Sequence, residues 1–173
     1  MKLFNKIGKC FNKRQYTKAL QETIDALELY PNRFELWEGK GKINYALGNY
    51  DKAIEDFTKA IELDENFAPA YFNRGIVYYA LKNYDKAIED FTKAIVLDEN
   101  YAPAYNNRGN AYCELKNYDK AIEDYTKAIE LGLDNVPEPY AGLYEAYKAL
   151  NQTEKAEEYL EKAKALGYKP EEE

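Results

Sequence analysis

The sequence predicts an all-α protein built as a solenoid of about five helical hairpins. The main observation is a phrase of thirteen residues that occurs at 49–61, 83–95 and 117–129, with 34 residues between successive starts. A fixed period of this size is typical of stacked helical repeats. Within each copy the apolar residues recur at the spacing of a helix, and no stretch of the chain alternates as a strand would.

The repeated phrase has the chemistry of an amphipathic helix. In the first copy, Asp51 lies at the start, where a carboxylate suits the positive end of the helix dipole. Glu55 precedes Lys59 by four residues, which is the favourable order for a surface pair. A helix with one apolar stripe must stack on a neighbour to bury that stripe. The stripe consists of Ala53, Ile54, Phe57, Ala60 and Ile61.

The period divides the chain into five units of one continuous repeat domain. The first unit is degenerate, the next three carry the phrase, and the last is more polar in its second half. Terminal repeats are commonly atypical because one side faces water. The predicted units are 1–33, 34–67, 68–101, 102–136 and 137–170, followed by a short tail at 171–173.

The composition argues against several classes of protein. The 173 residues carry a net charge of −7 and include no histidine. The negative charge disfavours nucleic acid as a partner, and no apolar run approaches the ~18 residues of a membrane span. Because histidine is absent and the two cysteines, Cys10 and Cys113, form no CxxC motif, we expect no metal and no cofactor. Lysines interrupt any signal peptide, so a cytoplasmic location is expected.

The N-terminus differs in charge from the rest of the chain. Residues 1–18 hold six basic side chains and no acidic ones, which leaves −13 for the remainder. The apolar side chains within Lys2–Asn12 fall on one helical face. The pattern predicts the first helix of a terminal repeat, and the alternative is a basic amphipathic helix that touches an anionic membrane.

We find no arrangement of residues typical of an enzyme. Adjacent carboxylates recur at the period, and we expect them on the solvated side of the second helices. Cys113 has no basic neighbour in its motif that would activate the thiol, so we interpret it as a small, partly exposed residue. The recurring pairs are Glu55 and Asp56, Glu89 and Asp90, and Glu123 and Asp124.

Two neighbouring units differ mainly on one helical face. Residues 68–97 and 102–131 are identical at 23 of 30 positions. Four of the seven differences have the relative spacing 0, 4, 7 and 8, which is one face of the first helix. Because charged positions of the second helix are unchanged, we favour a ligand-facing surface over random drift. The four pairs are Phe72/Asn106, Ile76/Asn110, Tyr79/Cys113 and Ala80/Glu114.

The period and motif resemble the tetratricopeptide repeat family, whose pattern runs W-x2-L-G-x2-Y, A-x3-F, P. The second unit matches it with Trp37, Gly41, Ala53, Phe57 and Ala60. The third and fourth units match at Tyr71, Gly75, Tyr78, Ala87, Phe91 and Ala94, and at Tyr105, Gly109, Tyr112, Ala121, Tyr125 and Ala128. The departures are Lys40, Arg74 and Arg108 at the usual Leu, and Glu65 and Glu99 at the usual Pro.

The resemblance implies a right-handed superhelix whose first helices line a concave, peptide-binding groove. It also implies that Asn73 and Asn107, one period apart, resemble part of an asparagine ladder that holds a peptide backbone. An alternative is that both amides brace a neighbouring hairpin. The expected groove residues are Glu38, Lys42, Tyr45, Phe72, Asn73, Ile76, Tyr79, Asn106, Asn107, Asn110, Cys113 and Glu114, with Glu145 and Lys148 from the last unit.

The same resemblance disfavours one ligand, the acidic tail of a chaperone. The carboxylate clamp of the family needs several Lys and Arg residues, and the corresponding places hold residues such as Glu38 and Pro103. The sequence therefore predicts a non-catalytic adaptor or scaffold that binds another protein or peptide segment. The alternatives are a self-associating protein and a membrane-surface adaptor docked through its basic N-terminus.

Overall fold

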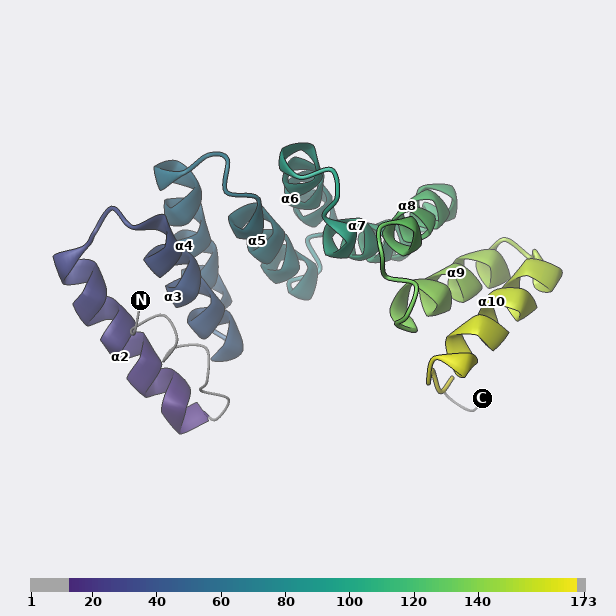
Figure 1. Cartoon of the computed structure of the whole chain (residues 1–173), viewed down its shortest axis with the longest axis horizontal. Coiled ribbons are helices and arrows are strands. Elements are labelled where there is room, and N and C mark those ends of the chain that lie inside the picture. The colour runs from purple at the N-terminus through teal and green to yellow at the C-terminus, as the bar shows by residue number, and fades with distance from the viewer. Residues whose placement is uncertain (1–12, 171–173) are drawn as a thin grey trace. The chain divides into compact units, whose positions relative to one another are not determined.

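The computed structural model describes residues 13–170, and within that range the chain forms nine α-helices and no strand (Figure 1). The predicted helix Lys2–Asn12 lies outside the described residues. The all-α prediction is confirmed. The helices are α2 Lys13–Leu29, α3 Phe34–Ala46, α4 Tyr50–Leu63, α5 Ala68–Ala80, α6 Tyr84–Leu97, α7 Ala102–Glu114, α8 Tyr118–Glu130, α9 Glu138–Ala149 and α10 Thr153–Ala165.

The chain divides into two compact units, Met1–Leu81 and Lys82–Glu173. In the first unit, α2, α3, α4 and α5 pack consecutively. In the second unit, α6 packs on α7, α7 on α8, α8 on α9, and α9 on α10. Each unit also brings two non-consecutive helices together, α3 with α5 and α7 with α9. The first helices of successive hairpins therefore share one side within each unit.

The turns that close the hairpins use a left-handed residue. Gly48 ends the α3 turn with φ 79°, as expected for glycine. Lys116 adopts φ 59° at the equivalent turn after α7, although it has a side chain. Asn117 N–H then donates to the Tyr112 carbonyl at 2.8 Å, which satisfies the end of that helix. The reversal places α8 against α7.

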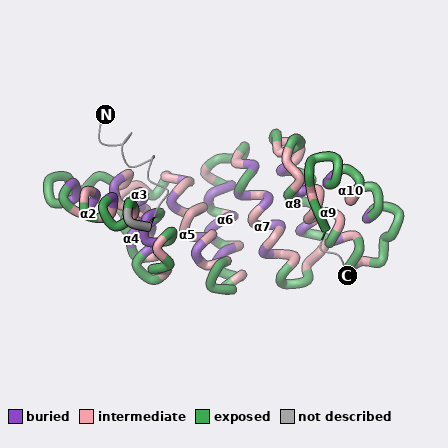
Figure 2. The backbone as a smooth tube through the Cα atoms, turned by 90° about the horizontal axis from the view of Figure 1, so that it is seen from below, coloured by how far each residue is buried: buried purple, intermediate pink, exposed green. Residues whose placement is uncertain are grey.

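Small residues allow the helices of a hairpin to approach an aromatic ring. In the first unit, Phe57 is 1% exposed, and a Cβ on Gly41 would lie 2.7 Å from its ring. In the second unit, Tyr125 fills the same place in a cluster with Ala121 and Leu143. Figure 2 shows buried residues recurring along the helices while the connecting turns are largely exposed. The repeated Ala and Gly positions are thus packing positions.

The structure corrects the expectation for the paired carboxylates. The glutamates of the pairs are exposed, but Asp56, Asp90 and Asp124 are buried. Asp56 accepts from Lys40 at 2.6 Å, and Asp124 accepts two hydrogen bonds from Arg108, at 2.7 and 2.8 Å. A buried carboxylate is costly unless it is paired in this way. Lysine and arginine at the usual Leu position thus supply the charge that these aspartates require.

The pair in the second unit joins more helices, although Asp56 of the first unit also accepts a hydrogen bond of 2.7 Å from the buried Asn44 of α3. The Arg108 guanidinium also donates to Thr92 of α6 at 3.0 Å, so it joins three successive helices. Burial opposes the charge of Arg108, but the hydrogen bonds and the charge of Asp124 outweigh burial and raise the pKa of the guanidinium. Lys40 has a single ammonium group and lacks the paired N–H donors with which a guanidinium binds both oxygens of a carboxylate.

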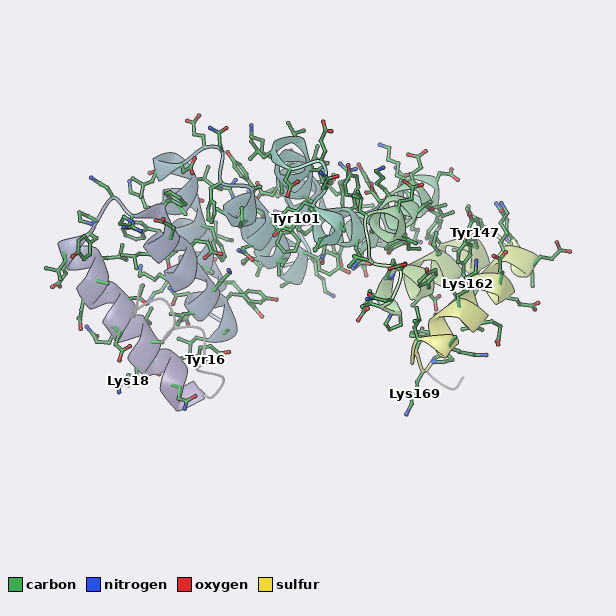
Figure 3. The ribbon with its side chains drawn as sticks, viewed as in Figure 1. Tyr16, Lys18, Tyr101, Tyr147, Lys162 and Lys169 are labelled. Carbon is green, nitrogen blue, oxygen red and sulfur yellow. The ribbon has the colours of Figure 1, made fainter. Side chains whose placement is uncertain are left out.

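The final hairpin holds a stack of aromatic and basic side chains. The Tyr147 and Tyr159 rings are parallel, with centroids 5.5 Å apart, and Lys162 lies 4.7 Å from the Tyr159 centroid. Figure 3 labels Tyr147 and Lys162 on these two helices. Ile129 of α8 packs against the same cluster as Leu143 of α9. The last hairpin therefore covers an apolar side of the hairpin before it.

Candidate functional site

The predicted groove residues fall on two surfaces, one in each unit. We call the first the α3/α5 face, made of Glu38, Lys42, Tyr45, Phe72, Asn73, Ile76 and Tyr79. We call the second the α7/α9 face, made of Asn106, Asn107, Asn110, Cys113, Glu114, Glu145 and Lys148. Each is described by itself.

Glu38 on the α3/α5 face is buried, and its Oε1 has two partners within the protein. Its carboxylate is paired with Lys42 on the next turn of α3. It also accepts a hydrogen bond of 2.8 Å from the Asn73 amide of α5. The hydrogen bond links two successive hairpins, so Asn73 acts as a brace in this structure. The Glu38 carboxylate thus has two donors from the protein itself.

The rest of the α3/α5 face is apolar and aromatic. Phe72, Ile76 and Tyr79 lie on one side of α5 and are each partly exposed. Tyr45 is 36% exposed, and its ring lies 5.6 Å from that of Tyr50. This surface can offer apolar contact and ring stacking.

The asparagines of the α7/α9 face have different environments. Asn106 is 9% exposed, its Oδ1 is buried without a hydrogen-bond partner, and its amide makes no hydrogen bond to any described residue. Asn107 donates to the Pro103 carbonyl of its own helix at 2.8 Å. Asn110 accepts from the Tyr125 hydroxyl at 2.8 Å. Asn107 thus does not repeat the bracing bond of Asn73, although the two residues are one period apart.

Sequence reasoning missed the close approach of the Tyr125 ring to Gly142 of α9. A Cβ on Gly142 would lie 2.4 Å from the Tyr125 ring, so only glycine fits at that place in α9. In the first unit the equivalent place of the repeat belongs to Asn73. The signal was present in the sequence as the Phe91/Tyr125 difference together with Gly142.

Cys113 lies where the two helices of this face meet. Burial raises the pKa of the Cys113 thiol, the Tyr125 hydroxyl at 3.5 Å opposes that rise, and the charges of Glu114 and Glu145 add to it. Glu114 comes from α7 and Glu145 from α9, and both side chains are exposed. Glu114 accepts a hydrogen bond of 2.8 Å from Tyr84. The face therefore carries two carboxylates around a neutral thiol.

Sequence profiles of one family match most of the chain. The profile described as Tetratricopeptide repeat matches residues 68–101 and 102–132. The one described as TPR repeat matches residues 41–82, and a further Tetratricopeptide repeat profile matches 145–166. The chain belongs to the tetratricopeptide repeat (TPR) family. The predicted family is confirmed, and the described helices form an all-α TPR solenoid.

Solved structures of TPR proteins resemble the chain. "Crystal structure of MamA" is 29% identical with a TM-score of 0.82, covering 89% of this chain and 90% of that one. The "First TPR of Spaghetti (RPAP3) bound to HSP90 peptide SRMEEVD" is 28% identical with a TM-score of 0.59, covering 75% of this chain and 94% of that one. MamA 41-end from Desulfovibrio magneticus RS-1 is 23% identical with a TM-score of 0.83, covering 95% and 92%, and shows the shared fold. A search of curated proteins found no match.

Two further features of residues 13–170 concern other kinds of site. The helices in this range lack the combination of length and apolar character that crossing a membrane requires. The same residues contain no group of histidine, cysteine or carboxylate side chains suited to holding a metal ion.

Proposed function

We propose that this TPR protein is a non-catalytic adaptor that binds a peptide segment of another protein along its first-helix faces. TPR repeats are generally interaction modules, and the neighbour at 28% identity is bound to a peptide. The observation that carries the proposal is the contrast between fixed and varied positions. Packing residues such as Ala87 and Ala121 are identical between the copies, whereas Phe72 and Asn106 differ on the first-helix face.

The structure supports the proposal through the environment of these varied residues. The α3/α5 face offers a partly exposed apolar and aromatic surface at Phe72 and Ile76. The α7/α9 face offers amide and carboxylate groups, of which the Asn106 Oδ1 has no hydrogen-bond partner among residues 13–170. A bound peptide could satisfy such groups with its backbone or side chains. The two faces differ in chemistry, so each suits a ligand segment of a different kind.

The proposal can be tested by selecting peptides from a random displayed library on the immobilised chain. The selected peptides are then titrated against Phe72→Ala, with Leu81→Ala, at the exposed C-cap of the same helix, as a control. We expect Phe72→Ala to weaken binding about tenfold with little change in melting temperature. If Phe72→Ala instead lowers stability by about 3–5 kcal/mol, Phe72 is a core residue. A library that yields no peptide contradicts peptide binding itself.

Self-association remains a second candidate, on one specific observation. A cavity of about 380 Å³ lies on the last hairpin. Tyr144 of α9 and Ala156 and Leu160 of α10 give this cavity an apolar wall. Another hairpin could cover that wall, because repeats bury such surfaces on their neighbours. Sedimentation velocity at several concentrations, with Leu160→Glu as the variant, separates this function from binding to a different protein.

A further inference from the structure

The helix α10 exposes the face that α8 buries against α9. In α8 this face consists of Tyr125 and two isoleucines, and all three belong to the cluster that includes Leu143 of α9. In α10 the equivalent side chains are exposed or partly exposed. We call these three residues, Glu157, Leu160 and Lys164, the open face of α10. The equivalent pairs, aligned on the buried Ala121 and Ala156, are Ile122/Glu157, Tyr125/Leu160 and Ile129/Lys164.

The open face of α10 borders a cavity with an apolar wall. The cavity holds about 380 Å³, and Ala156 and Leu160 of α10 line it together with Tyr144 of α9. Glu157 lines the same cavity. Because Leu160 and Tyr144 are each partly exposed, a second molecule can bury apolar surface there. Apolar surface with charged side chains beside it is the usual composition of a protein–protein contact.

The two charged residues of the open face have opposite signs and lie on either side of Leu160. Glu157 precedes Leu160 by three residues and Lys164 follows it by four, so all three share one side of the helix. At a rise of about 1.5 Å per residue, the charged residues lie roughly 4.5 and 6 Å from Leu160 along the axis. A two-fold axis beside Leu160 would place Glu157 of each copy opposite Lys164 of the other. The face is therefore complementary to itself, as an isologous contact requires.

The ammonium group of Lys164 is available for such a contact. In the single chain it pairs with Glu161 of the same helix at 2.9 Å, and both side chains are well exposed. An exposed pair on a helix surface contributes little stability, so Lys164 can exchange Glu161 for another carboxylate at small cost. Helices that pack together lie about 8–10 Å apart, which long side chains such as Lys and Glu can span.

The mixed charge of this face favours a second copy of α10 over the basic N-terminal segment as the occupant. Residues 1–18 carry six basic side chains and no acidic ones. That segment would meet Lys164 of the open face, and Lys148 at the same cavity, as well as Glu157. An antiparallel copy of α10 instead brings each charge of the open face to its opposite.

We propose that two copies of the chain associate through the open face of α10, with the two helices antiparallel about a two-fold axis. Leu160 and Tyr144 of each copy cover the apolar wall of the other, and Glu157 pairs with Lys164 across the contact. The inference rests on the self-association given above as the second candidate function and specifies its geometry. Because the contact is small, we expect a weak dimer, with a dissociation constant of about 0.1 mM.

Sedimentation velocity of the full chain, over concentrations from about 5 to 500 µM, tests the contact. We expect the weight-average mass to rise from 20.1 kDa toward twice that value. Leu160→Glu puts two carboxylates at the centre of the contact and should raise the dissociation constant about tenfold or more, with a melting curve recorded on the same sample. Growth beyond a dimer would indicate a head-to-tail contact and contradict the two-fold axis.

Charge reversal tests the pairing without changing the apolar wall. Glu157→Lys and Lys164→Glu each place like charges opposite one another, so each alone should weaken the dimer about tenfold. The double variant restores opposite charges and should recover most of the association. An equimolar mixture of the two single variants should form a heterodimer, because one then carries two positive charges on the face and the other two negative ones. Failure of both the double variant and the mixture to recover association would overturn the pairing.

Matched controls make the same charge changes on another side of α10. Glu158→Lys and Lys162→Glu alter an exposed ion pair that lies outside the open face. We expect both to leave the dissociation constant within about twofold of the unaltered chain. Equal weakening by the control and open-face variants would show that net charge governs association, which contradicts the proposal. If the chain dimerises but no open-face variant changes the dimer, this geometry falls and self-association stands. If the chain stays monomeric throughout, both fall.

Discussion

The α3/α5 face and the α7/α9 face share one scaffold but differ in how their polar groups are satisfied. On the first, Glu38 is paired with Lys42 and braced by Asn73. On the second, the Asn106 Oδ1 has no partner within the described structure. At equivalent repeat positions the two faces differ as Glu38/Asn106, Lys42/Asn110 and Asn73/Gly142, with Phe57/Tyr125 behind them. A repeat can thus lose an internal brace and keep the same helices.

The buried ion pairs show the same contrast and carry the largest predicted effect. Asp124→Ala should lower the free energy of unfolding by about 3–5 kcal/mol, because it leaves Arg108 buried without its carboxylate. Asp56→Ala should cost less, about 1–3 kcal/mol, because the flexible Lys40 side chain can turn its ammonium toward water and only the neutral Asn44 amide is left buried without its acceptor. Urea denaturation of both variants, with the exposed Glu123→Ala as control, measures the difference. Equal losses would contradict the distinction between the two pairs.

The close approach of α9 to Tyr125 gives the next prediction. Gly142→Ala should destabilise by about 1–3 kcal/mol, since its Cβ would lie 2.4 Å from the ring. In a Tyr125→Phe background the loss should be smaller, because phenylalanine is free of the hydroxyl bond to Asn110 and can shift. A double-mutant cycle from thermal melts measures this coupling. An additive result would show that the hydroxyl does not hold the ring against α9.

Asn73 and Asn107 offer a direct comparison of equivalent residues. Asn73→Ala should cost about 1 kcal/mol of stability because it removes the bond to Glu38. Asn107→Ala should leave stability within about 0.5 kcal/mol, since its amide bonds only to the Pro103 carbonyl of its own helix. Melting and affinity for a library-selected peptide are measured on the same samples. Loss of affinity in Asn107→Ala alone supports the peptide-backbone role of Asn107, and unchanged affinity in both variants would retire the asparagine ladder.

The smallest expected effect concerns the thiol of the α7/α9 face. Because burial raises the pKa of Cys113, less thiolate is present at pH 8 in the folded chain than in the unfolded chain. Iodoacetamide should therefore react more slowly with the folded protein, in a Cys10→Ser background that leaves one thiol. Glu145→Gln removes one cause of the raised pKa and should speed the reaction about twofold, whereas Glu123→Gln should not. Identical rates for the two variants would place Glu145 away from the thiol.

The sequence predicted the helices and their packing because both follow from periodicity. Ala53, Phe57 and Gly41 fall at fixed places in the period, and all three are buried as that pattern requires. Sequence position alone could not show that Asp124 is buried, since its neighbour Glu123 is exposed and equally acidic.

A signal for the buried aspartates was nonetheless present. A basic residue at the usual Leu position always precedes an aspartate by 16 residues, as in Lys40 and Asp56. In the last unit, Leu143 restores the usual residue and Tyr159 stands in place of the aspartate. The hydrogen bonding of Asn106 carried no such signal, because it depends on the orientation of Tyr125 and on the space beside Gly142.

The central claim is that varied first-helix positions, not the second helices, contact a partner. Titrating the isotope-labelled chain with a library-selected peptide, followed by amide NMR shifts, tests it most directly. The account predicts the largest shifts at the side-chain amides of Asn106 and Asn110 and the backbone amide of Cys113. Shifts concentrated on α8 around Glu123, or spread evenly over exposed carboxylates, would contradict it.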